Sequence, residues 1–180
     1  SLNKFIKYLP NEQYIIALDR GKDTTVNWES NFPVNIQKKV HNSGLGYSWN
    51  WCYKQANREY ILHTEEDWSI FVDEERFNKI IKTAIKVIDK NDGIFRFDNM
   101  CQDFWKSGWT KKQIDNIKYL ELNRPKEFRD LQIYYYSNRP HLKKREFTIN
   151  NNLWHKENVS PPKVEMYMCL KYFQSNKKVF

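Results

Sequence analysis

From residue 59 to residue 68 the chain reads Glu-Tyr-Ile-Leu-His-Thr-Glu-Glu-Asp-Trp, a strand-forming run that ends in consecutive carboxylates. Like charges at the end of a strand repel one another, and a divalent cation among them relieves the repulsion. Open α/β sheets bind ligands at the carboxyl ends of their strands, where Glu65, Glu66 and Asp67 are expected to fall. The stretch therefore predicts a metal site at a sheet edge. The simpler interpretation is a solvated turn whose acids cap the next helix.

Length, charge and cysteine content limit the classes of protein to consider. The 180 residues fit one domain with a sizeable core, and the abundant aromatic residues argue against disorder. A formal net charge of +8 favours an anionic partner such as a nucleotide phosphate or nucleic acid. Cys52, Cys101 and Cys169 are far apart, which supports neither a disulfide framework nor a zinc site. Without a transmembrane-length or signal-peptide pattern, we expect a cytoplasmic protein with no membrane span.

The hydrophobic pattern alternates between helical and strand periods. Helical spacing in residues 2–9 ends at Pro10, and residues 73–88 predict a strongly amphipathic helix. We also expect strands at 14–18, 34–40, 60–64, 94–97 and 133–136, helices at 47–58 and 163–174, and helical content near 111–118. This order predicts an α/β sandwich on a mostly parallel sheet, in a single domain over residues 1–180. From the residues at the two chain ends, we expect that domain to be cut from a longer chain.

Several local patterns, taken in chain order, resemble nucleotide-sugar glycosyltransferases of the GT-A type, in the family-2-like group. Residues 15–25 are similar to the family's second strand and the turn after it, and residues 42–50 to the segment that opens the next helix. Residues 58–68 resemble the strand that carries the metal-binding Asp-x-Asp, with Glu65 in the first acidic position. Residues 136–144 resemble a later Asn-Pro segment, interrupted here by Arg139.

The resemblance implies a GT-A (Rossmann-like) α/β/α sandwich. Residues 1–97 would form the nucleotide-sugar-binding half and residues 98–180 the acceptor-side half. It further implies that Asp67 is a direct ligand of Mn²⁺ or Mg²⁺ and that Glu65 is a second ligand or a water-mediated contact. Glu66 would face either the sugar or solvent. Such an ion stabilises a departing diphosphate as a Lewis acid.

The nucleotide contacts also follow from the resemblance. Asp19 would accept a hydrogen bond from the base, the backbone at Gly44 would approach phosphate or ribose, and Asn50 would contact the ligand. A basic cluster suited to the diphosphate consists of Arg139, His141, Lys143, Lys144 and Arg145. Simpler explanations stand beside these roles: a turn-forming aspartate, an ordinary glycine at a helix start, a buried hydrogen-bonding asparagine and a solvated charged edge.

The resemblance places a general base at Glu165, near the start of a late helix that carries residues 164–166. An inverting transferase needs such a group to deprotonate the acceptor hydroxyl. A glutamate near a helix N-terminus is also favoured by the helix dipole alone, which is the simpler explanation.

The implied reaction moves a sugar from a UDP- or GDP-sugar donor to a hydroxyl of a glycan or protein acceptor, and it depends on a divalent metal. The main alternative is a nucleic-acid-binding protein or metal-dependent nuclease, because basic and aromatic residues are interleaved. No RNP, KH, zinc-finger or helix-turn-helix pattern supports that alternative, so we expect no nucleic-acid partner. A third possibility is a transferase-like binding module without activity.

Overall fold

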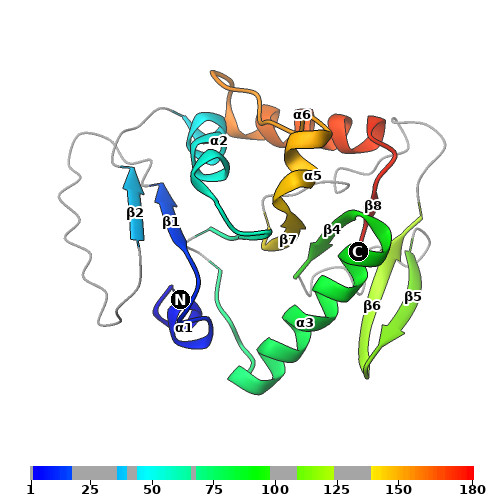
Figure 1. The fold of residues 1–180 in the computed structure, drawn as a ribbon. Coiled ribbons are helices and arrows are strands. Elements are labelled where there is room, and N and C mark those ends of the chain that lie inside the picture. Colours follow the sequence, from blue (N-terminus) through cyan, green and yellow to red (C-terminus); the bar gives the residue numbers. More distant parts are fainter. Residues whose placement is uncertain (1, 18–35, 40–43, 66–67, 98–108, 124–138) are drawn as a thin grey trace.

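The computed structural model describes residues 2–17, 36–39, 44–65, 68–97, 109–123 and 139–180 (Figure 1). The helices are α1 (Leu2–Tyr8), α2 (Leu45–Gln55), α3 (Glu74–Asn91), α5 (Arg145–Asn150) and α6 (Pro161–Gln174). The strands are β1 (Tyr14–Ala17), β2 (Ile36–Lys39), β3 (Tyr60–His63), β4 (Gly93–Arg96), β5 (Trp109–Ile114), β6 (Ile117–Leu122), β7 (His141–Lys144) and β8 (Lys178–Val179). The expected strand at 133–136 lies outside the described residues.

The central sheet has the strand order β3-β7-β4-β8 and is mixed. Strand β7 runs antiparallel to both β3 and β4, whereas β4 and β8 are parallel. Strands β1 and β2 form a separate parallel pair. The expectation of a mostly parallel sheet is therefore wrong for the described pairings. The reason is that β7 comes from much later in the chain and enters between β3 and β4 in the opposite direction, which local sequence patterns do not specify.

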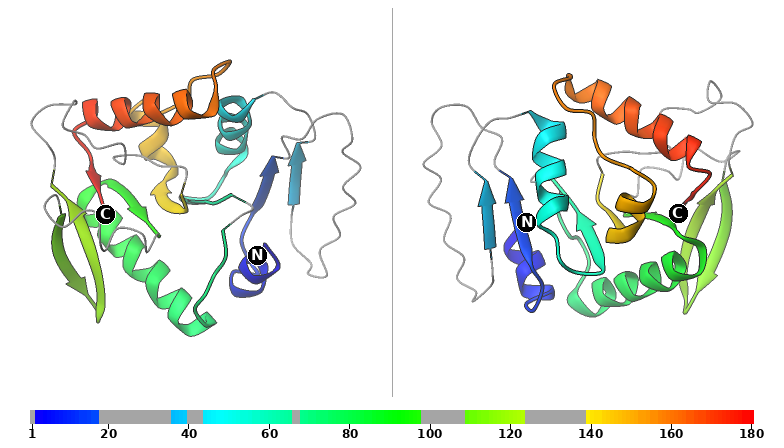
Figure 2. Two further views of the ribbon diagram at one scale, coloured as in Figure 1. Left: turned by 180° about the vertical axis from the view of Figure 1, so that it is seen from behind. Right: turned by 45° about the horizontal axis from the view of Figure 1, so that its top comes forward.

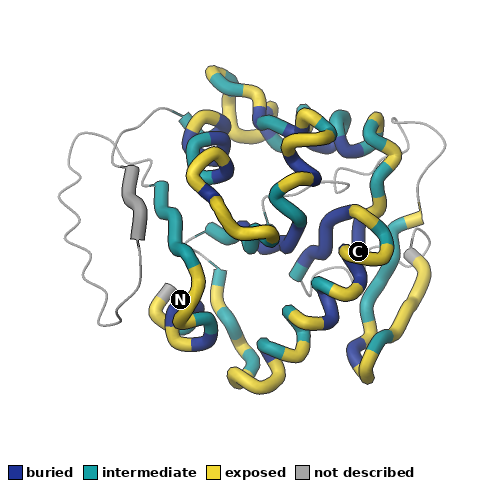
Figure 3. The backbone as a smooth tube through the Cα atoms, viewed as in Figure 1, coloured by how far each residue is buried: buried dark blue, intermediate teal, exposed yellow. Residues whose placement is uncertain are grey.

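Helices cover both faces of the central sheet. Successive side chains of a strand point to opposite faces. Accordingly, Ile94 packs in a buried cluster with Met168 of α6, while the next residue, Phe95, packs in another with Ala84 of α3. Figures 1 and 2 show α6 and α3 on opposite sides of the strands, and Figure 3 shows the buried backbone running between them. The layered α/β arrangement expected from the sequence is present in the described residues.

Helix α3 forms for local reasons that the sequence displays. The Asp73 side chain accepts a hydrogen bond of 2.7 Å from the Arg76 amide and so caps the first turn. Phe77, Ala84 and Ile88 of its apolar stripe are buried, as expected. No helix in the described ranges, α3 included, is long and apolar enough to cross a membrane.

The predicted helical content near residues 111–118 is wrong. Strands β5 and β6 form an antiparallel hairpin whose register runs from Trp109 opposite Leu122 to Ile114 opposite Ile117. Asp115 and Asn116 connect them with φ angles of 47° and 65°. A two-residue loop with positive φ at both positions matches the right-handed twist of a hairpin, and Asp and Asn tolerate that conformation. This turn chemistry overrode the helix-forming lysines and glutamine of the segment.

Candidate functional site

The carboxyl end of β3 meets the start of β7 at one edge of the central sheet. Their register places His63 opposite His141, so Glu65 just beyond β3 lies at the same edge as Arg139 just before β7. The end of β4 reaches this edge as well, because the Phe97 amide donates to the Pro140 carbonyl at 2.8 Å. The antiparallel β7 therefore brings one acidic and one basic predicted site residue together, although they are far apart in the chain.

Of the two predicted metal ligands, Glu65 lies within the described residues and Asp67 does not. The Glu65 side chain is partly buried, and its carbonyl accepts hydrogen bonds from the Trp68 amide and the Thr64 hydroxyl, both at 3.3 Å. Glu66, Asp67 and Asp19 lie outside the described residues. Within the described stretches, no three His, Cys, Asp or Glu side chains form a group that could hold a metal ion. The metal site around Glu65 and Asp67 thus stays a prediction.

Two glycines shape the start of α2 in different ways. Gly44 is the N-cap residue, with φ of 79°, a conformation that L side chains rarely adopt. A Cβ atom on Gly46, by contrast, would lie 2.3 Å from the Lys156 carbonyl oxygen. Gly44 thus gives α2 its direction of approach, and Gly46 lets the backbone of another segment pass close to the helix. The approach of phosphate or ribose expected at Gly44 remains a prediction.

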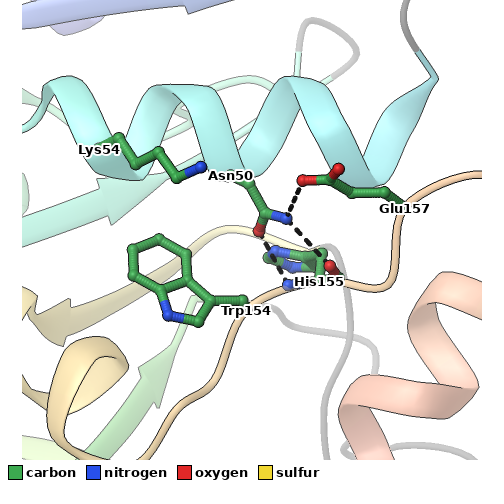
Figure 4. Close-up of a pocket in the computed structure, with 5 residues that line it drawn as sticks. All are labelled: Asn50, Lys54, Trp154, His155 and Glu157. Atoms are coloured by element: carbon green, nitrogen blue, oxygen red, sulfur yellow. Dashed lines mark hydrogen bonds between the residues drawn. The ribbon is translucent and has the colours of Figure 1, made fainter.

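Asn50 holds that neighbouring segment against α2. Its Oδ1 accepts a hydrogen bond from the His155 amide at 2.8 Å, and its Nδ2 donates to the His155 carbonyl at 2.9 Å. Nδ2 also donates to Glu157 Oε1 at 2.8 Å (Figure 4). Asn50 is 4% exposed, so these bonds lie in the protein interior. In this structure its amide group serves the protein's own chain, the simpler of the two roles considered for it.

A buried polar cluster lies behind the sheet edge. It consists of His63, His141, Lys143, His155 and Tyr53. The rings of His63 and His141 stack with centroids 4.7 Å apart, and Tyr53 stacks on His155 at 5.5 Å. The Tyr53 hydroxyl is 3.1 Å from His63 Nδ1. His141 is 0% exposed, and its Nδ1 donates to the Arg139 carbonyl at 2.9 Å. His141 therefore faces the interior and contacts the edge through the backbone of Arg139.

The electrostatics of this cluster are dominated by burial. Burial lowers the pKa of His63 to about 3, with the nearby charge of Lys143 as a second cause. Burial also lowers the pKa of His141 and His155 well below the usual histidine value. The pKa of Lys143 falls to about 7 for the same reason. Because a low dielectric disfavours charge, the three histidines are neutral at neutral pH.

The predicted basic cluster is divided by strand alternation. His141 and Lys143 point to the buried face of β7 that looks toward α2, whereas Lys144 points to the other face. The Lys144 ammonium lies 2.7 Å from Asp89 of α3 and 3.9 Å from Glu59. Arg145 Nε donates to the Ala56 carbonyl at 2.6 Å. Arg139, just before β7, lies at the same sheet edge as Glu65.

Glu165 lies in the second turn of α6 and is partly buried. Its neighbour Val164 is fully buried and packs against Trp49 and Tyr53 of α2, which fixes α6 on that helix. The structure thus confirms the expected late helix, and the role of Glu165 as a general base stays a prediction.

Sequence reasoning named Asn50 but missed the other residues that line a pocket beside α2. The pocket is lined by Asn50, Lys54, Trp154, His155 and Glu157 (Figure 4). Trp154 was not among the residues to which the sequence analysis gave a role. No local signal could have found this group, because Asn50 and His155 are separated by 105 residues.

Comparison with known proteins gives a fold and not a family. No protein-family model and no curated protein sequence matches the chain. Among solved structures, residues 1–349 of S. aureus TarS, a glycosyltransferase, match with a TM-score of 0.56 and 16% identity, over 93% of this chain and 48% of that solved chain. The same protein in complex with UDP-GlcNAc matches with a TM-score of 0.56 and 15% identity, over 93% of this chain and 46% of that one.

The chain thus spans about half the length of the solved structures that it matches. The likeness covers nearly the whole of this chain, so it concerns the described architecture and not one isolated motif. At 15–16% identity the likeness shows the fold alone. The narrower assignment to the GT-A type and the family-2-like group stays a prediction. The protein shares the fold of this solved glycosyltransferase.

Proposed function

We propose that this protein is a glycosyltransferase that moves a sugar from a nucleotide-diphosphate donor to a hydroxyl of a glycan or protein acceptor. The observation that carries the proposal is a glycosyltransferase fold over 93% of the chain, with the acidic end of β3 at a sheet edge. The UDP-GlcNAc complex of TarS supports a UDP-sugar as donor, with a GDP-sugar as the alternative. Fold alone does not fix function, so the residues at the edge must supply the chemistry.

The proposed donor site is the edge that Glu65 and Arg139 share. Glu65 and Asp67 supply hard oxygen ligands of the kind that Mn²⁺ or Mg²⁺ prefers, and Glu66 faces the sugar. A bound ion would provide Lewis-acid stabilisation of the diphosphate leaving group. Arg139 adds a cationic side chain at the same edge, and His141 positions it through the hydrogen bond to its carbonyl. Asp19 is proposed to accept a hydrogen bond from the nucleotide base.

The start of α2 is proposed to face the diphosphate or ribose. Gly44 precedes a helix of 11 residues, whose first backbone amides and dipole favour an anion. Among the described residues other than its chain neighbours, no atom lies within 4 Å of a Cβ built on Gly44, which is compatible with a close ligand. Asn50, further along α2, contributes through the segment that it holds and not by direct contact.

Glu165 is proposed as the general base of an inverting transfer. Its carboxylate takes the proton of the acceptor hydroxyl, the hydroxyl oxygen forms a bond to the anomeric carbon, and the bond from that carbon to the diphosphate breaks. Glu165→Gln should therefore lower the rate of sugar transfer about a hundredfold or more while leaving donor binding unchanged. Equal transfer rates in the variant and the wild type would remove Glu165 from the mechanism.

The first experiment is calorimetric titration with UDP and with GDP, each with and without Mn²⁺, on the wild type and on Asp67→Ala. We expect metal-dependent binding of one nucleotide that is lost in the variant, because Asp67 is the proposed ligand. Glu146→Ala is the matched control, since Glu146 is an exposed carboxylate at the start of α5.

Absence of nucleotide binding under every condition would contradict an active transferase. An oligonucleotide titration would then separate the remaining alternatives, because nucleic-acid binding weakens steeply with salt. A binding module without activity would show neither property.

A further inference from the structure

A second candidate site lies beside α2, apart from the edge at Glu65. The pocket between α2 and the segment 153–160 has a volume of about 420 Å³, within the range of about 300–1,000 Å³ typical of small-molecule sites. Asn50 and Lys54 come from α2, and Trp154, His155 and Glu157 come from the segment (Figure 4). The ring centroid of Trp49 lies 4.7 Å from that of His155, which lines the pocket, and 5.1 Å from that of His63 in β3.

The pocket wall is held in place by specific contacts. The hydrogen bonds of Asn50 fix both the backbone of His155 and the carboxylate of Glu157. The close passage of Lys156 past Gly46 fixes the next residue of the segment. A partly exposed tryptophan and a carboxylate are thereby presented in a preorganised arrangement, which lowers the entropic cost of binding a ligand.

The lining combines an aromatic face with donors and acceptors of hydrogen bonds. Lys54 Nζ lies 5.9 Å from the centroid of the Trp154 ring, and Glu157 lies beyond Asn50 on the other side (Figure 4). Glu157 Oε1 accepts from Asn50, and a carboxylate has acceptor sites for further bonds. Lys54 contributes three ammonium donors and is exposed.

We propose that this pocket binds a saccharide ring. A pyranose has an apolar C–H face that packs on an indole, and neighbouring hydroxyls that both donate and accept hydrogen bonds. Glu157 would accept hydrogen bonds from such hydroxyls, and Lys54 would donate hydrogen bonds to them. A nucleotide phosphate is disfavoured here, because the fixed carboxylate of Glu157 would repel it. If the proposed function holds, the saccharide is part of the acceptor. The binding itself does not depend on that function.

The test is saturation-transfer NMR with the methyl glycosides of glucose, galactose and N-acetylglucosamine. The proteins are the wild type, Trp154→Ala and Lys54→Ala, with Phe71→Ala as control because Phe71 is an aromatic residue 93% exposed outside the pocket. We expect at least one glycoside to bind the wild type and Phe71→Ala equally, and to bind both pocket variants about tenfold more weakly. Lys54→Ala changes an exposed side chain, so it reports on the pocket even if Trp154→Ala unfolds.

Two results would overturn the saccharide site: no glycoside binds the wild type, or binding is unchanged in both pocket variants. A UDP titration on the same proteins separates this failure from failure of the proposed function. UDP binding without glycoside binding would overturn the saccharide site alone. Glycoside binding that depends on Trp154, without UDP binding, would support the site while contradicting the transferase.

Discussion

The Lys143 ammonium nitrogen lies 3.9 Å from the centroid of the Tyr53 ring, at a position where the Lys143 side chain is 0% exposed. Within the part of the chain that the structure describes, this nitrogen has no hydrogen-bond partner. A desolvated cation on an aromatic face gains about 2 kcal/mol, which offsets only part of the cost of burial. The protonated form of Lys143 thus destabilises the interior behind the sheet edge.

Lys143→Met should stabilise the protein. Methionine fills a similar volume without a charge, so we expect a gain of about 2 kcal/mol in the free energy of unfolding, or about 4–8 °C in Tm. Calorimetric melting measures it. The matched control is Lys79→Met on the exposed side of α3, which should change stability by less than about 0.5 kcal/mol. A lower Tm for Lys143→Met would show that the ammonium group makes a stabilising interaction.

The same lysine predicts a dependence of stability on pH above neutrality. The pKa of Lys143 is about 7 in the folded protein and 10.5 as the usual value, so between these values the unfolded chain binds a proton that the folded chain does not. Stability contributed by this group therefore rises as pH increases from about 7 toward 10.5. The prediction is checked by urea unfolding of the wild type and of Lys143→Met between pH 7 and 10.5. The free energy of unfolding should rise with pH in the wild type, and the contribution of Lys143 to this rise should be absent in the variant.

His63 predicts a loss of stability in acid. Its pKa is about 3 in the folded protein, against an ordinary value of 6.5. Between these values His63 is therefore protonated in the unfolded chain and neutral in the folded protein. Stability falls as pH decreases from 6.5 toward 3, by up to about 1.4 kcal/mol per pH unit for this one group. In urea unfolding, His63→Gln should show a shallower pH dependence by up to one proton. An unchanged slope would mean that His63 is protonated inside the folded protein.

Asn50→Ala should destabilise the protein and release the segment 153–160. The substitution leaves the buried amide and carbonyl of His155 without the Asn50 partner, at a cost of about 2–4 kcal/mol. Urea unfolding gives the cost, and hydrogen exchange of the His155 amide reports the release. Asn57→Ala, an exposed asparagine just beyond α2, is the control. If the His155 amide still exchanged slowly in Asn50→Ala, Asn50 would not be what holds this segment in place.

Gly46→Ala should destabilise the protein, although alanine is normally better than glycine in a helix by about 0.5–1 kcal/mol. The reason is the 2.3 Å approach of a Cβ to the Lys156 carbonyl, which forces the segment away from α2. We expect a fall in Tm together with a change in Trp154 fluorescence. Gly44→Ala should also lower Tm, because its φ of 79° is strained for alanine. It should not change the fluorescence, because no atom of the other described segments lies within 4 Å of a Cβ built there. Identical fluorescence in all three proteins would contradict this distinction.

Several elements could be predicted because their causes are local. Asp73 caps α3 through a bond to Arg76, three residues away, and Pro161 stands in the first turn of α6. The run at β3 was predicted from its strand-forming residues. The hairpin of β5 and β6 was missed although its signal is also local, because Asp115 and Asn116 were not interpreted as a turn with positive φ.

The candidate site was predictable only in part. The acids after β3 were identified from charge, and the structure places Glu65 at a sheet edge. That Arg139 lies at the same edge, and that Lys143 is buried while Lys144 pairs with Asp89, depends on the position of β7 between its neighbours. A basic run in the sequence does not reveal this division, because alternation separates side chains only once a strand is known to be there.

The sequence by itself determined where α1, α3, β3 and α6 form, since capping, proline and hydrophobic period act over a few residues. The tertiary structure alone decided that the central sheet is mixed and that Lys143 lies on Tyr53. It also decided that Asn50 holds a segment 105 residues away to form the pocket. The physical reason is that burial and hydrogen bonding between distant segments set these features, and no local pattern encodes which segments will meet.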